Sequence, residues 1–322
     1  MRFLTVVTSI ALCASTLAAK KLTLNDLPAP VQKTVQAELK GAEIKNIGKE
    51  TENGVTQYEV ETMLNGKHRD FNVDTKGNLL VTEEETTIDA IPAAAKAAIV
   101  KKIADGKLGT IEILTRNGAT MYEAAYTTKA GKKQEFVYNT LGTQGSNPYF
   151  NLTPGYRLRY QDGGDVDTLT VLNETKRIDG VETRVVEDRE EKNGALVELT
   201  RDYYAIDSVT NDVFYFGEDV DVYKNGKVVS HEGAWLSGVK GAKFGLMMPA
   251  APKSGQKFYQ EHAPGAGMDH AEIVALDEKV TTPAGTFDHC VHVVEDGKDH
   301  KWYARGPGLV KDGKLVLVEY TK

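Results

Sequence analysis

Apolar residues follow two different spacings in the first part of this 322-residue chain. At positions 31, 35 and 39, and again at 91, 95, 99 and 103, they recur every four residues, which predicts an apolar helix face. Asp26 and Asp89 precede these segments and are expected to cap the helices. From residue 58 to 64, apolar and polar residues alternate, which predicts a strand with one buried face.

The same motifs occur twice: the first copy begins at position 27, and the second begins at position 91. The matching pairs are Leu27-Pro28 with Ile91-Pro92, Asn53-Gly54 with Asn117-Gly118, and Tyr58-Glu59 with Tyr122-Glu123. Self-similarity at a fixed period indicates repeated structural units. We therefore predict two tandem repeats, over residues 24–85 and 88–145, each with one helix packed on a small antiparallel sheet.

The order of these motifs resembles that of a known family. A Leu-Pro helix start, Asn-Gly, Tyr-Glu-Val, Asn-Gly-Lys, Phe-x-Val-Asp and Lys-Gly-Asn follow one another in the first repeat. This order resembles PepSY-like domains, also described as β-lactamase-inhibitor-like domains. The second repeat departs from it, with Tyr138-Asn139 where the first has Val73-Asp74. The resemblance implies an envelope or extracellular domain that binds or inhibits proteins such as peptidases, and it implies no catalytic residues.

Residues 147–322 show a strand-like pattern instead. Tyr156, Leu158 and Tyr160 alternate with Arg157 and Arg159. Dipeptides that suit tight hairpin turns recur, namely Asp179-Gly180, Asn193-Gly194, Asn225-Gly226, Asp296-Gly297 and Asp312-Gly313. They predict an antiparallel meander without crossover helices. The expected fold class is thus α+β, with two helix-plus-sheet repeats followed by a mainly antiparallel β domain.

Three segments of this second half are similar to segments of bacterial envelope proteins of unassigned function. They are Asn147-Pro148-Tyr149-Phe150, Pro283-Ala284-Gly285-Thr286-Phe287 and Trp302-Tyr303-Ala304. This resemblance implies that the β domain is a curved sheet or half-barrel. It implies nothing about activity.

The amino terminus predicts export. Arg2 supplies a positive charge, and an apolar run follows that ends at Ala19, as in a cleaved secretory signal peptide over residues 1–19. The run is shorter than the roughly 20 residues that a membrane-spanning helix needs, so we expect no transmembrane segment. Leu12 precedes Cys13 where a lipobox needs a small residue, so a lipoprotein is not expected. We predict a periplasmic or secreted protein.

Charge and cysteine content narrow the possible partners. The net charge is −7 and no Lys/Arg-rich stripe interleaves with aromatic residues, so nucleic acid is not an expected partner. Cys290 is the only cysteine beyond the predicted signal peptide, which leaves no intramolecular disulfide. The predicted domains therefore depend on their hydrophobic cores for stability.

No motif in the sequence is complete enough for an active site. Residues 308–314 spell the start of a phosphate loop, but Leu315 stands where a serine or threonine would bind magnesium. Trp235 stands where the second histidine of a zinc-protease motif would follow His231, and no serine lies in a G-x-S-x-G motif. We therefore expect no enzyme, no catalytic residue and no cofactor.

Cys290 and His292 would share one face of a strand, with His300 a few residues later. Thiolate and imidazole are ligands that suit zinc or copper. Two ligands do not complete a metal site, and a buried cysteine with partly exposed histidines is the favoured interpretation. The sequence therefore predicts no metal site.

Three acidic runs, at residues 83–85, 187–191 and 218–221, raise the alternative of paired carboxylates for acid–base chemistry or of calcium binding. Residues 162–167 do not follow the order of a calcium loop, because their glycines come too early. We expect all these acidic residues to lie in turns or on solvated strand faces.

Two apolar stretches, residues 234–236 and 243–252, are the remaining candidates for function. Phe, Leu and Met cluster in the second among Gly, Ala and Pro, so this loop is either buried under the sheet, which is the default, packed on another domain, or part of a ligand groove. The residues expected to contact an apolar ligand are Trp235, Phe244, Met247, Met248, Phe258 and Tyr259.

Three hypotheses of function follow. The first is an exported, non-catalytic protein of the bacterial envelope that binds or inhibits another protein, such as a peptidase, through its repeats. The alternative is a carrier or sensor of a small apolar ligand in the β domain. The third is an enzyme whose catalytic groups come from positions far apart in the sequence.

Overall fold

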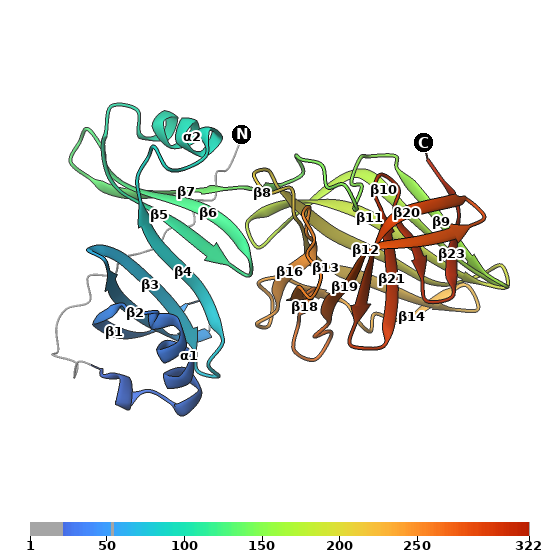
Figure 1. Cartoon of the computed structure of the whole chain (residues 1–322), viewed down its shortest axis with the longest axis horizontal. Coiled ribbons are helices and arrows are strands. Elements are labelled where there is room, and N and C mark those ends of the chain that lie inside the picture. Colours follow the sequence, from blue (N-terminus) through green and yellow to red (C-terminus); the bar gives the residue numbers. More distant parts are fainter. Residues whose placement is uncertain (1–21, 53–54, 322) are drawn as a thin grey trace. The chain divides into compact units, whose positions relative to one another are not determined.

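The computed structural model describes residues 22–52 and 55–321 (Figure 1). The predicted signal peptide and Cys13 lie outside the described residues, as does the Asn53-Gly54 motif. The chain divides into two compact units, of which the first ends at Thr140 and the second begins at Leu141. Each unit is built mainly from one antiparallel sheet.

Unit 1 is a seven-stranded sheet with two α-helices, and its strands follow one another in chain order across the sheet. The helical segments are the 3-10 turn η1 (Leu24–Asp26), α1 (Ala29–Leu39) and α2 (Ala93–Ile103). The strands are β1 (Glu43–Glu52), β2 (Val55–Leu64), β3 (Lys67–Asp74), β4 (Leu79–Thr86), β5 (Lys107–Arg116), β6 (Ala119–Thr127) and β7 (Lys133–Asn139). Neither α-helix of the described chain is long and apolar enough to cross a membrane.

Both α-helices begin directly after a proline. Pro28 and Pro92 occupy the N-cap positions with φ of −56°, the value that the proline ring fixes. Neither helix receives a side-chain cap, so the expected capping by Asp26 and Asp89 is wrong. Asp26 lies in η1 instead, and Asp89 forms an exposed ion pair with Lys96 at 2.7 Å.

The prediction of two separate helix-plus-sheet repeats is wrong. β4 pairs with β5, for example Thr82 with Thr115, so the strands of both halves form one continuous sheet. This pairing satisfies two strand edges whose N–H and C=O groups would otherwise be open. The chain is nearly all antiparallel β, with only two α-helices in its described part, rather than α+β. The same finding overturns the assignment to PepSY-like repeats.

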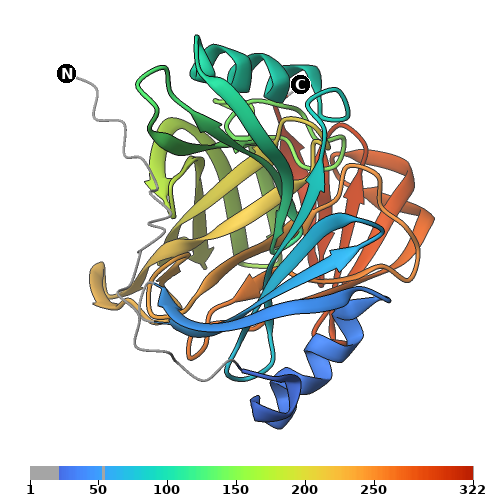
Figure 2. The same cartoon turned by 90° about the vertical axis from the view of Figure 1, so that its left-hand side faces the viewer.

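Each helix of unit 1 packs its apolar face on one end of the sheet (Figure 2). The buried residues around α1 are Leu27, Val31, Val35, Ile47, Tyr58, Val60, Phe71 and Val73. Those around α2 are Ile91, Ala95, Ile99, Ile111, Tyr122 and Ala124. Both groups lie on the same face of the sheet. Paired residues point to the same face, and Phe71 pairs with Thr82, which pairs with Thr115 on β5. Ile111 lies an even number of positions before Thr115 on this strand, so the two side chains share a face.

The opposite face of this sheet carries a row of carboxyl groups. The row crosses five strands and consists of Glu59, Asp70, Glu83, Glu112 and Glu123. Burial is the main cause that raises their pKa values, and neighbouring carboxylates add to it. The pKa of Glu83 rises to about 8 and that of Glu123 to about 7. The acidic run at residues 83–85 is therefore not a fully solvated strand face.

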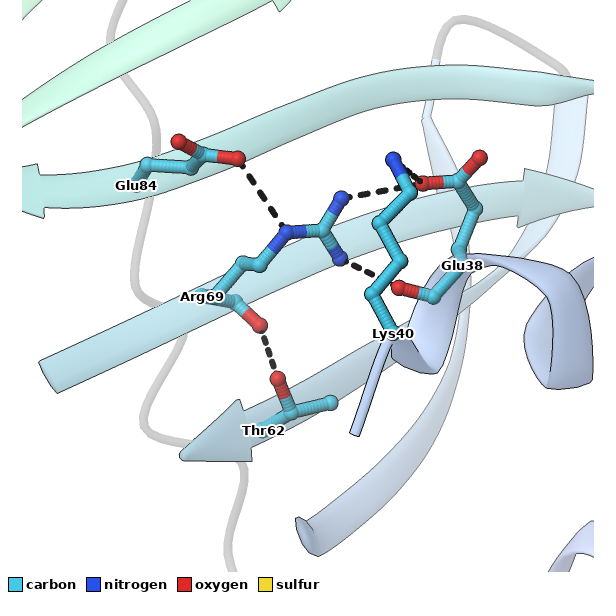
Figure 3. Close-up of polar contacts among 5 residues, drawn as sticks. All are labelled: Glu38, Lys40, Thr62, Arg69 and Glu84. Atoms are coloured by element: carbon cyan, nitrogen blue, oxygen red, sulfur yellow. Dashed lines mark hydrogen bonds and ion pairs between the residues drawn. The ribbon is translucent and has the colours of Figure 1, made fainter. Parts of the chain in front are cut away.

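Arg69 on β3 joins the end of α1 to the sheet (Figure 3). Its buried guanidinium group donates hydrogen bonds to the Glu38 carbonyl oxygen at 2.6 Å and to the Glu38 carboxylate at 2.9 Å. It also donates to the Glu84 carboxylate on β4 at 3.1 Å, while the Thr62 hydroxyl on β2 donates to the Arg69 carbonyl oxygen. The planar guanidinium group of Arg69 thus connects the last turn of α1 with β3 and β4.

Replacing Arg69 with lysine is expected to lower the free energy of unfolding of unit 1 by about 2 kcal/mol. The ammonium group of lysine cannot make all the hydrogen bonds of the planar guanidinium group at once. Hydrogen bonds to charged groups contribute about 1.5–3 kcal/mol each, and less where the partner is exposed. Hydrogen–deuterium exchange of amides in α1 and β3 measures the change. Lys45→Gln removes an exposed ion pair with Glu43 and serves as the control. Unchanged protection in R69K would contradict the prediction.

Unit 2 is built from one sixteen-stranded sheet. Its strands are β8 (Leu141–Gly142), β9 (Arg157–Asp162), β10 (Asp165–Ile178), β11 (Val181–Lys192), β12 (Ala195–Asp207), β13 (Val213–Lys224), β14 (Lys227–Ser230), β15 (Trp235–Leu236), β16 (Lys243–Met248), β17 (Lys257–Tyr259), β18 (Glu261–His262), β19 (His270–Thr282), β20 (Gly285–Glu295), β21 (Asp299–Ala304), β22 (Gly308–Asp312) and β23 (Leu315–Tyr320). The main path across the sheet is β17-β19-β20-β21-β22-β23-β9-β10-β11-β12-β13-β16-β18.

Tight turns join many consecutive strands of unit 2. Asp179, Asn193, Asn225 and Asp296 have positive φ values between 46° and 54°, and a glycine follows each of them. Asn and Asp tolerate this left-handed region better than other residues, which is why such dipeptides form hairpin turns. The antiparallel meander that they predict is confirmed.

The sheet of unit 2 curls until it nearly closes on itself. β23 pairs with β9, so that Tyr320 lies opposite Leu158. At the other side, only Gln260 separates β17 from β18, the two ends of the path. A Cβ atom at Gly245 on β16 would lie 2.4 Å from the Tyr259 and Gln260 carbonyl oxygens, so only glycine permits this approach. The expected half-barrel is therefore wrong, and the unit is a nearly closed barrel.

Candidate functional site

The interior of the unit 2 barrel contains a cavity of about 240 Å³. Its aromatic and aliphatic lining residues include Tyr149, Phe150, Leu158, Leu169, Val171, Val186, Tyr204, Tyr215, Met247 and Tyr303. Its charged lining residues are Asp167, Asp188, Asp202, Glu261, Asp269, Glu295, Lys301 and Asp312. Aromatic and aliphatic walls with convergent polar groups are typical of a small-molecule site, and in this cavity eight of the lining side chains are charged.

The register of β10, β11 and β12 brings three carboxyl groups together. Side chains at alternate positions of a strand point to the same face of a sheet. Asp188 lies opposite Leu169, which is two residues beyond Asp167, and Asp202 lies opposite Val186, which is two residues before Asp188. The three carboxyl groups therefore run diagonally across the inner face of three neighbouring strands.

Burial raises the pKa of each of these three groups. The pKa of Asp188 lies well above its usual range, because the adjacent Asp167 adds to the effect of burial. The pKa of Asp167 is also raised by burial, against the opposing effects of a hydrogen bond with Asp188 and the charge of Lys301. Burial raises the pKa of Asp202 to about 7, even though the Tyr215 hydroxyl donates to it at 2.6 Å. Two adjacent buried carboxyls favour one shared proton.

Lys301 on β21 supplies a positive charge to the same cavity. Its Nζ lies 2.9 Å from Glu295 Oε2 on β20 and 3.5 Å from Asp312 Oδ2 on β22. Burial alone would lower the pKa of Lys301, but these two carboxylates raise it above its usual range. This shift favours the charged ammonium group, which is engaged with Glu295 and Asp312.

Further acidic groups lie near Asp167, Asp188 and Asp202. Burial raises the pKa of Glu218 to about 8, and the Asp202 carboxylate, which lies opposite it on β12, adds to the shift. Burial raises the pKa of Glu261 to about 7, with Asp269 as the next largest cause. The barrel interior thus concentrates acidic groups far in excess of its basic ones.

Three carboxylate oxygens of the cavity wall are buried and accept no hydrogen bond from any described residue. They are Asp167 Oδ1, Asp188 Oδ1 and Glu295 Oε1. A buried polar atom without a partner costs about 1–3 kcal/mol, and native structures contain few of them. Three of the six such side-chain atoms in the described chain belong to residues of this one cavity wall.

The six residues predicted to contact an apolar ligand do not gather at one site. Met247 lines the cavity. Trp235 and Met248 are buried in the core around the cavity, and the Trp235 ring packs edge-on against Tyr215. These three residues thus belong to the cavity wall and its support, although a role in ligand binding stays a prediction.

The other three predicted contacts lie elsewhere. Phe244 is buried against Phe214 and Phe216, outside the core that surrounds the cavity. Phe258 is partly buried and packs on that core. Tyr259 is 50% exposed, and its ring contacts His270. The apolar segment therefore divides among several environments, and burial is the commonest.

Sequence reasoning missed the acidic part of the cavity. The expectation that residues 187–191 and 218–221 are solvated is wrong for Asp188 and Glu218. A signal for Asp188 was available, because it shares its face of β11 with Val186. Asp167 is likewise in phase with Leu169 and Val171 on β10. An acidic residue in phase with apolar ones predicts a carboxyl group inside the barrel.

Cys290 does not form a metal site with the nearby histidines. It is buried, its Sγ donates to the Phe287 carbonyl oxygen at 3.5 Å, and burial raises the pKa of its thiol to about 11. His292 instead contacts Glu278 at 2.9 Å and His300 at 2.8 Å. Within residues 22–52 and 55–321, no group of three or more His, Cys, Asp or Glu side chains is arranged to hold a metal ion.

The chain matches no family model and no curated protein with which it was compared. The PepSY-like resemblance of the short motifs thus has no support from the whole sequence either. The cavity must therefore be interpreted from its own geometry.

Proposed function

We propose that this protein binds a small organic molecule in the cavity of unit 2. The supporting observation is a cavity of about 240 Å³ whose wall combines aromatic rings with unpartnered carboxylate oxygens. This volume lies a little below the roughly 300–1,000 Å³ of typical ligand pockets. It therefore suits a compact ligand rather than a long acyl chain.

The aromatic part of the wall is held in place before any ligand arrives. The Tyr204 ring stacks on Tyr215 and contacts Phe150, with both pairs of ring centroids 4.9 Å apart. The Tyr156 hydroxyl donates to the Pro307 carbonyl oxygen at 2.9 Å. A wall that is already ordered loses little side-chain freedom on binding, which favours affinity.

The proposal modifies the hypothesis of a carrier for an apolar ligand. A purely apolar ligand would displace water from the cavity and leave one oxygen each of Asp167, Asp188 and Glu295 without a hydrogen-bond partner, which is unfavourable. The ligand should therefore combine an apolar body with a polar group. The hypothesis that unit 1 binds another protein stays a prediction.

Native mass spectrometry of the full-length protein, purified gently from its own host, tests the proposal. We expect one small organic molecule per chain. Leu169→Trp should abolish this added mass, because the larger side chain fills the cavity. Thr170→Trp adds the same bulk on the outer face of β10 and should retain it. An unliganded wild-type protein whose melting temperature no compound library raises would overturn the proposal.

A further inference from the structure

We propose that the ligand of the unit 2 cavity is an organic amine whose ammonium group binds at the paired carboxyl groups of Asp167 and Asp188. This inference rests on the proposed function and names the chemical class of the ligand. Its basis is the pair of buried, unpartnered oxygens, Asp167 Oδ1 and Asp188 Oδ1, in the wall of the cavity.

The charge balance of the cavity favours a cation over a neutral or anionic ligand. Among the described residues, Lys301 is the basic side chain that lines the cavity, and its Nζ is already held by Glu295 and Asp312. Asp167 and Asp188 form no ion pair with a described Lys or Arg side chain. An alkylammonium group carries three donors and a full charge, so it can pair with both carboxyl groups at once.

The remainder of the wall defines the body of the amine. Phe150 and Tyr204 lie on the aromatic part of the cavity, and Leu169 and Val171 extend the inner face of β10 beyond Asp167. Aromatic faces also attract an adjacent cation. The small volume of the cavity, about 240 Å³, admits a compact amine. An arylalkylamine fits this description.

Binding of an amine should release protons. The groups that act on the Asp167–Asp188 pair are Glu190 on β11, Asp202 on β12, Lys301 on β21 and the Tyr160 hydroxyl on β9. Without ligand, burial raises the pKa values of both members of the pair and of Asp202. A bound ammonium stabilises the carboxylate forms, so its arrival lowers these pKa values. Affinity should therefore rise with pH, about tenfold per unit for each proton released.

Three molecules of nearly equal size and different charge test the inference: 2-phenylethylamine, 2-phenylethanol and phenylacetate. Titration calorimetry of the full-length protein at pH 6 and 7, in buffers of different ionisation enthalpy, measures affinity and protons released. We expect the amine to bind at least tenfold more tightly than the alcohol, with release of about one proton. Phenylacetate should bind most weakly.

Two variants locate the binding position. Asp188→Asn should weaken amine binding at least tenfold and leave 2-phenylethanol unchanged, and asparagine resembles the protonated acid, so folding should be retained. Glu187→Gln changes the neighbouring carboxyl on the other face of β11 and should alter neither affinity. Should D188N bind the amine as well as wild type, Asp167→Asn provides the second test, and normal amine binding by both variants overturns the inference.

The possible failures are distinct. If the alcohol or phenylacetate binds as tightly as the amine, the cation assignment is wrong while small-molecule binding stands. Amine binding without proton release or pH dependence also overturns the assignment to the carboxyl pair. If none of the three binds, the amine inference is overturned, and the native mass spectrum separately decides whether unit 2 holds any small molecule.

Discussion

Replacing Lys301 with methionine is expected to lower the free energy of unfolding of unit 2 by about 2–3 kcal/mol at pH 8, less than for a fully buried ion pair because the side chains are partly exposed. Its ammonium group lies between Glu295 on β20 and Asp312 on β22, with Nζ to oxygen distances of 2.9 and 3.5 Å. Methionine fills a similar volume without charge. The two carboxylates would then remain in the barrel without a cation, and this unpaired burial causes most of the loss.

Urea titration followed by the fluorescence of Trp302, the chain neighbour of Lys301, measures this loss. The double variant Lys301→Met with Glu295→Gln should recover at least half of the lost stability, because it removes one of the two carboxylates. At pH 5 the loss should shrink, since burial raises the pKa of Asp312 and eases its protonation. Equal losses in the single and double variants would show that packing, and not charge, explains the effect.

In unit 1, replacing Glu83 with glutamine is expected to stabilise the sheet by about 2–3 kcal/mol at pH 9 and to have little effect at pH 4. Burial, with Glu112 and Glu123 as further causes, raises the pKa of Glu83 from 4.5 to about 8. The unfolded chain releases this proton near pH 4.5, so the stability present below that pH is lost as the pH rises through 8. Each unit of difference between the folded and unfolded pKa values corresponds to about 1.4 kcal/mol. The partial exposure of Glu83 reduces the resulting stabilisation.

Hydrogen–deuterium exchange of peptides from β4 and β5, expressed as protection factors, measures this effect for unit 1 alone. Glu84→Gln is the matched control, because Glu84 is the next residue on β4 and points to the other face. There it accepts a hydrogen bond from Arg69 at 3.1 Å. E84Q should therefore lower protection at pH 9, where E83Q raises it. Two variants of the same sign would refute the role of burial at Glu83.

The local elements of this fold could be predicted from the sequence, because local spacing determines them. The apolar positions 31, 35 and 39 lie on α1, and the Asn-Gly and Asp-Gly dipeptides lie at hairpin turns. The pairing of β4 with β5 and of β23 with β9 could not be predicted in this way. These contacts join distant segments, and no pattern within one strand specifies its partner across such a distance.

The candidate site was hidden for a different physical reason. Asp188 stands in a run of charged residues, and such runs are most often solvated. The pairing of β11 with β10 turns Asp188 inward beside Leu169 while the neighbouring Arg189 points outward. Met247 lines the cavity, but its selection as a contact of an apolar ligand rested only on its apolar surroundings in the sequence, and that role stays a prediction. The position of Asp188 in the inward–outward alternation of β11, rather than its residue type, determines that it lies inside the barrel.

The pairing of β23 with β9 also determines when unit 2 can fold. Arg157 and Thr321, which flank this pairing and share a hydrogen bond of 3.1 Å, are 164 residues apart. At a translation rate of about 5–20 residues per second, β9 is made roughly 8–30 s before β23 exists. The barrel therefore stays open until β23 has been made. For a chain that is predicted to be exported, this delay would keep unit 2 unfolded, and so able to pass through a translocation channel, until translocation is under way.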